Sequence, residues 1–193
     1  MRTFALALAL AAVALPAAAD HHEAAEKAAN PTQQAYLFVW DDGAKKTLDL
    51  ARAIPADKYS WRPAEGVRSV AEAFQHISGG IYYLTMMLGV EPPAGHPSSK
   101  EEAGALEKAT AKDEVIASLE KALAYARQLA IDASPELLAK EVDFFGSKID
   151  GRTMILLLNV HLHEHLGQEI AYARSIGVVP PWSQPQAPAS TGY

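Results

Sequence analysis

An all-α fold, a four-helix bundle in a single domain, is the architecture that this sequence predicts. Four segments carry apolar residues at the three- and four-residue spacing of an amphipathic helix, and stretches rich in proline or glycine separate them. Only residues 142–145 have a pattern that suits a short extended segment. Four long helices bury their apolar faces most economically against one another, so we assign residues 32–182 to the bundle.

The first predicted helix covers residues 32–54. Gly43 lies inside it, where glycine weakens a helix. The second predicted helix covers residues 69–88 and begins with Ser69, which is followed three residues later by Glu72. This pair has the capping-box pattern, in which the two side chains accept hydrogen bonds from backbone N–H groups that the first helical turn leaves without partners.

The second half of the bundle begins after a long connection at residues 89–104, which contains three prolines. Its length permits a crossover between two parallel helices. The third predicted helix covers residues 112–131 and the fourth covers residues 153–176. A turn signal at Asp150-Gly151 precedes the fourth helix, and Gly177 follows it as a residue type favoured just beyond a helix end.

The N-terminal segment, residues 1–19, has the pattern of a secretion signal. Arg2 supplies a positive charge, an apolar stretch follows, and three alanines precede Asp20 as a cleavage site. We expect residues 20–31 to form a mobile arm and residues 183–193 a flexible tail. The apolar stretch is too short to span a bilayer and no later segment is longer, so we expect an exported protein, periplasmic or secreted, with no membrane span.

Composition excludes some functions. The chain has no cysteine, so it forms no disulfide and offers no cysteine for lipid attachment at the signal. The formal net charge is −6 at pH 7. Proteins that bind nucleic acid broadly carry a basic surface, so the acidic balance argues against nucleic acid as a partner.

The strongest functional signal is the histidine-rich stretch at residues 159–168. His161 and His165 are four residues apart, and on a helix this spacing places two imidazoles on one face, where both can reach a single metal ion. His76, from the second predicted helix, is the best candidate for a third ligand. His163 lies about 200° around the helix from His161 and should point away.

The face of the second helix that carries His76 also contains Gly79 and Gly80. Glycine disfavours a helix interior by roughly 1 kcal/mol relative to alanine, so we expect these two residues to leave room for another group. A single histidine on a helix is more often an ordinary hydrogen-bonded residue than a ligand. The pair on the fourth helix is the stronger indication, because burying two imidazoles without partners is costly.

Five further side chains are candidates for orienting a ligand or contacting a substrate. Glu72 and Glu164 lie about 40° and 60° from the ligand directions on their helices, and each could orient a histidine or act as a general base. Gln168, Tyr172 and Tyr83 could hydrogen-bond to a bound water or substrate. The alternatives are a helix cap for Glu72, a solvated carboxylate for Glu164 and ordinary polar residues for the other three.

The opposite face of the fourth helix is also apolar. A helix that is apolar on two sides is either central or lies at an interface, and we therefore expect a homodimer that packs partly through this face. The residues of this face are Leu156, His163, Leu166, Gly167 and Ile170.

These motifs together resemble those of the DinB/YfiT-like superfamily of helical-bundle metalloproteins. Residues 66–76 are similar to the family's entry into the second helix, with its first ligand histidine. Residues 161–168 resemble the H-x-x-x-H-x-G-Q signature, and residues 172–182 resemble the tail that follows it. The match extends from about Tyr36 to Trp182, and its short motifs occur in the family's order.

The resemblance implies an up-down-down-up bundle, frequent dimerisation and a divalent metal held by His76, His161 and His165. Characterised relatives include transferases and isomerases that use low-molecular-weight thiols, and many members are described as metal-dependent hydrolases. Two features depart from the pattern: Leu166 stands where arginine is common, and the export signal argues against a cytosolic thiol cofactor.

Three functional hypotheses follow. The first is a metal-dependent hydrolase or transferase that acts on a small molecule. The second is a non-catalytic module that binds a metal or small ligand in the same place, and the third is a helical interaction protein whose histidines no longer bind anything. Zinc is the first expectation for three histidines, while imidazole also suits nickel, iron, copper and, less well, manganese.

Overall fold

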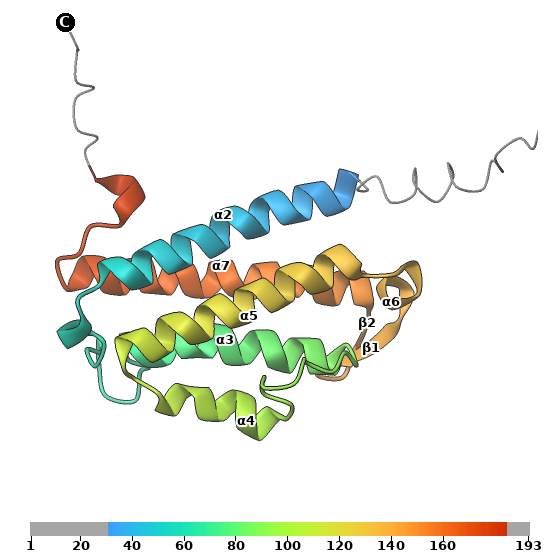
Figure 1. Ribbon diagram of the computed structural model, residues 1–193, viewed down its shortest axis with the longest axis horizontal. Helices are drawn as coiled ribbons and strands as arrows, with labels where there is room; N and C mark the ends of the chain where they lie inside the picture. The colour runs from blue at the N-terminus through green and yellow to red at the C-terminus, as the bar shows by residue number, and fades with distance from the viewer. Residues whose placement is uncertain (1–30, 185–193) are drawn as a thin grey trace, which may run out of the picture. The chain divides into compact units, whose positions relative to one another are not determined.

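The structure, a computed structural model, describes residues 31–184 of the 193-residue chain. The predicted all-α class is confirmed, because helices make up most of the described residues (Figure 1). Each long helix begins and ends within two residues of its predicted segment. These helices are α2 (Pro31–Ala53), α3 (Val70–Met87), α5 (Lys112–Asp132) and α7 (Gly151–Ser175).

The chain divides into two units, residues 1–31 and 32–193. The second unit contains the helices and the histidine cluster. The predicted signal peptide and N-terminal arm lie outside the described residues except for Pro31, and so does the predicted tail after Gln184. These assignments therefore remain predictions.

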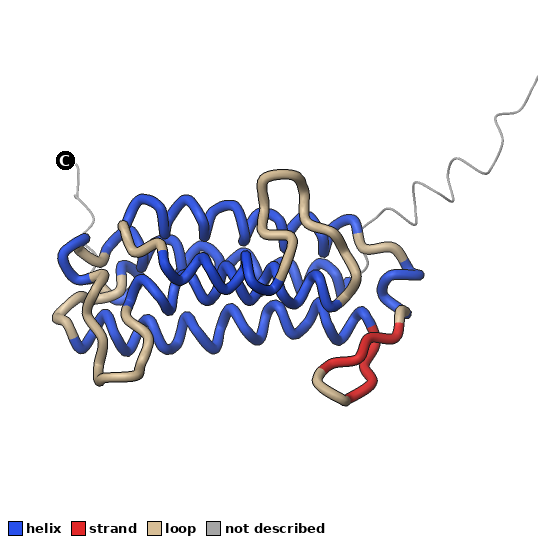
Figure 2. The backbone as a smooth tube through the Cα atoms, turned by 90° about the horizontal axis from the view of Figure 1, so that it is seen from below, coloured by secondary structure: helices blue, strands red, loops and turns tan. Residues whose placement is uncertain are grey.

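Within the second unit the four long helices lie side by side (Figures 1 and 2). In Figure 1, α2 and α7 run in one direction, and α3 and α5 run in the other. The long connection between α3 and α5 contains two short helical pieces that the sequence did not predict, α4 (Lys100–Ala105) and the 3₁₀ turn η2 (Leu106–Lys108). Two further 3₁₀ turns are η1 (Ala56–Lys58) and η3 (Pro181–Ser183).

The start of α3 has the predicted capping box. The Ser69 side chain accepts a hydrogen bond from the Glu72 backbone N–H at 3.3 Å, and the Glu72 carboxylate accepts one from the Ser69 N–H at 2.7 Å. Both bonds satisfy backbone donors that the first helical turn leaves unpaired. The capping box fixes the residue at which α3 begins, and this in turn fixes the position of His76 along the helix.

The start of α7 differs from the prediction of a turn at Asp150-Gly151. Asp150 ends strand β2 and caps the helix, its carboxylate accepting a hydrogen bond from the Thr153 N–H at 2.7 Å. Gly151 is the first helical residue. A side chain there would collide with the Leu137 carbonyl oxygen, so close packing rather than turn geometry requires the glycine.

A β-hairpin precedes α7. It consists of β1 (Glu141–Phe144) and β2 (Ser147–Asp150). Strand β1 contains residues 142–144 of the extended segment expected at residues 142–145. Its two-residue loop, Phe145-Gly146, has positive φ at both positions, as a type I′ turn requires. The hairpin loop projects from the helices (Figure 2). The short helix α6 (Pro135–Ala139) links α5 to the hairpin.

The core lies between the four long helices. Burial of its large apolar side chains is the main stabilising contribution to the fold, at roughly 25 cal/mol per Å². Fully buried examples are Trp40, Leu50, Phe74, Ile77, Ile81, Leu119, Met154, Leu158 and Leu162. Among the described residues, no helix is both long and apolar enough to cross a membrane.

Part of the α7 face predicted to meet a second copy is covered by α2 instead. Leu166 is buried in the core, and the His163 ring lies so close to Gly43 that any side chain at that glycine would meet it. Gly43 is therefore a packing site rather than only a weak point in the helix. Leu156 remains exposed on α7.

Candidate metal centre

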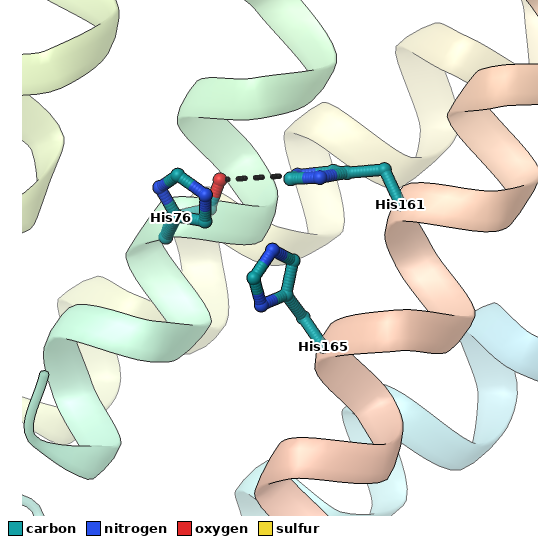
Figure 3. Close-up of side chains that lie close together, drawn as sticks. All are labelled: His76, His161 and His165. Carbon is teal, nitrogen blue, oxygen red and sulfur yellow. Dashed lines mark hydrogen bonds between the residues drawn. The ribbon is translucent and has the colours of Figure 1, made fainter.

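Three histidines from two helices converge between α3 and α7 (Figure 3). His76 lies on α3, and His161 and His165 lie one turn apart on α7. One ring nitrogen from each histidine lies within 4.8 Å of the others, and the ring centroids are 4.6 to 5.3 Å apart. Three half-buried imidazoles at this separation could hold one metal ion, and three protein ligands would leave coordination positions open.

His76 is held by a carboxylate. Its Nδ1–H donates a hydrogen bond to Glu107 Oε1 at 2.9 Å, and the other Glu107 oxygen accepts one from Arg68 Nε at 3.0 Å. Glu107 lies in η2, so the connection between α3 and α5 folds back over the site to provide it. Protonation of Nδ1 leaves the Nε2 lone pair of His76 available to a metal ion, an orienting role typical of carboxylates behind histidine ligands.

His165 is held by an amide. Its Nδ1–H donates to Gln168 Oε1 at 2.9 Å, and Gln168 Nε2 in turn donates to the Tyr172 hydroxyl at 2.8 Å. The Tyr172 ring packs edge-on against Trp61, with 5.5 Å between centroids. This chain of contacts fixes the His165 ring and leaves its Nε2 lone pair available, as for His76.

His161 is held by packing against α3. Its ring lies directly over Gly80, where a Cβ atom would come within 2.6 Å of Cε1, and its Nε2 is 3.4 Å from the His76 carbonyl oxygen. Burial is the main cause that lowers the pKa of His161 to about 4, and burial also lowers the pKa of His76. Both rings are therefore neutral near pH 7, the form in which imidazole binds metals.

Comparison with known proteins shows which family the chain belongs to. The sequence profile of the DinB superfamily matches residues 40–168, which include all three histidines. The chain belongs to the DinB superfamily. It is 29% identical over 134 residues to the uncharacterized protein YjoA of Bacillus subtilis (strain 168), covering 68% of this chain and 82% of that one.

Two solved structures of DinB-like proteins match this chain. One, from Bacillus cereus ATCC 10987, has a TM-score of 0.56 at 18% sequence identity, covering 77% of this chain and 95% of that chain. The other, the DinB-like protein YjoA of Bacillus subtilis, has a TM-score of 0.49 at 22% identity, covering 78% and 99%. The first supports the DinB fold, and the predicted superfamily membership is confirmed by the profile match.

Of the other side chains expected near the three histidines, some are connected to the cluster and others are not. Gln168 and Tyr172 are connected to His165, as described above. Glu72 is engaged by the Ser69 N–H and by Arg62, which together hold the pKa of its carboxyl below its usual range. Glu164 is exposed. The cap and the solvated carboxylate, the alternatives named for these two residues, are therefore what the structure shows.

Tyr83 is separated from the three histidines. Its ring contacts Phe145 of the hairpin loop, with 6.4 Å between centroids, and Lys100 Nζ lies 5.4 Å from its centre. Leu166, which departs from the DinB pattern, is packed in the core. His163 faces α2 and donates through Nδ1 to the Asn159 carbonyl at 2.9 Å.

Two acidic residues of importance were missed. Glu107 carries no local signal, because its role depends on how the α3–α5 connection folds over His76. Glu169 is fully buried on α7, and neither carboxylate oxygen has a hydrogen-bond partner among the described residues. A helical-wheel projection relative to His165 places Glu169 only about 40° away, which was the available signal for its burial.

The close packing of His161 on Gly80 leads to a mutational prediction. Gly80→Ala is expected to push the His161 ring out of place and weaken metal binding by roughly tenfold to a hundredfold, the range seen when ligand orientation is lost. Gly43→Ala is the matched control, because its new methyl group meets His163, which is outside the cluster. Zinc titration against a competing chelator measures both, and equal affinities for the two variants would contradict the prediction.

Proposed function

We propose that this protein is a divalent-metal-dependent enzyme, a hydrolase or transferase that acts on a small molecule at the three-histidine site. The observation that carries the proposal is the convergence of His76, His161 and His165, with ring nitrogens within 4.8 Å of one another. Three histidine ligands leave coordination positions for water or substrate, an arrangement typical of catalytic rather than structural metal sites.

The surroundings of the cluster support this use. Glu107 and Gln168 each accept a hydrogen bond from an imidazole Nδ1–H, so both histidines present Nε2 toward the cluster in the tautomer that ligation requires. The Gly80 position accommodates the third ring, which a larger residue would displace. The donor set therefore fits a borderline divalent ion, and zinc is the first expectation, with nickel, iron or manganese as alternatives.

The residues of the site have separable roles in such a reaction. When bound, a divalent ion supplies positive charge that polarises a substrate oxygen or favours loss of a proton from water. Glu107 places a negative charge behind His76, which increases the electron density that the imidazole offers. Tyr172 accepts its hydrogen bond from Gln168, so its own hydroxyl hydrogen is available to stabilise a substrate oxygen.

The proposal predicts that untagged wild-type protein purified from periplasm contains close to one equivalent of a divalent metal. Elemental analysis identifies the ion, and treatment with a strong chelator followed by calorimetric titration gives its affinity. A panel of ester, amide and phosphate substrates is then assayed with the metal-loaded and metal-free protein. Absence of metal above background together with no zinc binding on titration would refute the proposal.

A non-catalytic metal- or ligand-binding module is the second candidate. One observation favours it: Glu72, a predicted general base, is engaged in the helix cap, and Glu164 is exposed. The exchange of water at the loaded site separates the candidates. Fast water relaxation by a paramagnetic substitute such as Mn²⁺ indicates open positions and supports an enzyme, whereas a site closed by protein ligands supports the binding module.

Three broader features are part of the proposal. The directions of the four long helices in Figure 1 support an up-down-down-up bundle. Exposed apolar side chains on α2 and α7, among them Phe38, Leu156 and Val160, support a homodimer, which light scattering would test. The sequence of residues 1–19 supports export to the periplasm, and sequencing the N-terminus of the mature protein would test cleavage before Asp20.

A further inference from the structure

The tip of the hairpin holds an aromatic residue in an unfavourable backbone conformation. Phe145 has φ of 51°, in the left-handed region where a bulky side chain is rare, and 71% of its surface is exposed. Asparagine is the residue normally found at this position of a type I′ turn before glycine. A strained, solvent-exposed phenylalanine is not explained by hairpin stability, and such outliers cluster where structure serves a function.

Phe145 belongs to a small group of exposed and half-buried rings. It packs edge-on against Phe144, with 4.9 Å between centroids, and it contacts Tyr83 of α3 at 6.4 Å. Lys100, at the start of α4, lies over the Tyr83 ring. We call Phe144, Phe145 and Tyr83 the aromatic ledge. Three segments far apart in the sequence therefore meet at this ledge.

The ledge is aligned with the histidine cluster. Tyr83 follows His76 by seven residues, which is two helical turns, so both side chains project from one face of α3 and are about 10 Å apart along its axis. Gly79 and Gly80 lie between them, with the Ala103 carbonyl of α4 packed against Gly79 and the His161 ring of α7 packed against Gly80, so α4 and α7 flank this face. On α7, the half-buried Leu157 lies one turn before His161 on the same side.

We propose that the aromatic ledge binds the apolar end of the substrate whose polar end is held at the three-histidine site. The substrate class is a small molecule with a metal-binding group, such as an amide, ester or acid, and an aromatic or branched apolar group about 10 Å away. This inference rests on the proposed function, since it requires a metal at the histidines. The left-handed backbone conformation of Phe145 accompanies the placement of its ring beside Tyr83, where it would make this contact.

Hydroxamates provide the test, because they bind protein-held zinc through one end. Zinc-loaded full-length protein is titrated with acetohydroxamate and with phenylalkyl hydroxamates of increasing linker length. We expect an affinity maximum at the linker that brings the phenyl ring about 10 Å from the zinc-binding group, roughly tenfold tighter than acetohydroxamate. Affinity that does not depend on linker length would overturn the proposal.

Phe145→Asn is the decisive variant. Asparagine suits the turn, so the hairpin should be retained with a higher unfolding midpoint, while the advantage of the long hydroxamate is lost and acetohydroxamate binds as before. Tyr83→Leu should lose the same advantage, which gives a second test on a different element. Phe38→Gln, at an exposed aromatic on α2, is the matched control and should keep it.

The outcomes separate the two proposals. If acetohydroxamate fails to bind the zinc-treated wild-type protein, the three-histidine proposal is wrong and the ledge proposal is wrong with it. If acetohydroxamate binds and Phe145→Asn retains the full preference for the long hydroxamate, the metal site stands and the ledge has no role in binding.

Discussion

His165→Ala is expected to weaken zinc binding by at least about a hundredfold while the helical fold survives. Loss of an orienting partner alone costs tenfold to a hundredfold in comparable sites, so loss of a ligand should cost at least as much. The substitution also leaves Gln168 without the Nδ1–H donor that it accepts from. Gln168 is half-buried, so water can replace this donor, and the effect on folding should be small.

His163→Ala is the matched control for this experiment. His163 lies two residues away on the same helix and donates to the Asn159 carbonyl, but its ring packs against Gly43 of α2. Its removal should lower the unfolding midpoint slightly and leave zinc affinity unchanged. Calorimetric titration with zinc and far-UV circular dichroism measure both properties. Equal loss of affinity in the two variants would mean that the three-histidine cluster is not the binding site.

The long helices were predictable because their signals are local. Apolar spacing and the Ser69–Glu72 capping box fix α3 to within one residue, and no distant contact is needed to recognise them. Short elements were not predictable in the same way. Helix α4 has only six residues, fewer than two turns, so no apolar period can be measured over it. The hairpin turn uses Phe145 rather than asparagine, which removed its usual sequence signal.

The residues of the site were likewise predictable only where their signals are local. His161 and His165 follow from helical spacing, and their separation from His163 follows from the angle per residue. Glu107 could not be found, because it reaches His76 only through the fold of the connection between α3 and α5. The wheel relation between His165 and Glu169 was an unused signal of a shared face, and only the packing of α7 within the fold places Glu169 in the interior.

Glu169 is a destabilising group in the core. Its side chain is completely buried on α7, and neither carboxylate oxygen accepts a hydrogen bond from the described residues. Burial raises the pKa of this carboxyl well above its usual range, because the charged form loses its water and gains no partner. A polar group buried in this way typically costs about 1–3 kcal/mol, and more when it is charged.

Glu169→Met is therefore expected to raise the free energy of unfolding at pH 7.5 by roughly 2 kcal/mol. Methionine has a similar length and flexibility, so it fills the same space without the desolvation cost. Glu164→Met, at an exposed position of the same helix, is the matched control and should change stability by less than about 0.5 kcal/mol. Urea unfolding of the metal-free proteins measures these differences, and a destabilised Glu169→Met would show that the carboxyl has a favourable partner in solution.

The same residue predicts a pH dependence, which the Glu169→Gln variant isolates. A raised pKa in the folded state means that the unfolded chain releases its proton first as pH increases. The wild-type protein should therefore lose stability relative to Glu169→Gln from about pH 4.5, the ordinary glutamate range, up to the raised pKa of the folded state. Below that window both states are protonated and the difference between the two proteins should be constant. Unfolding curves collected across this pH range test the sign of the change in stability. If the wild-type protein instead gains stability relative to Glu169→Gln as pH rises, the carboxyl is ionised and stabilised in the core.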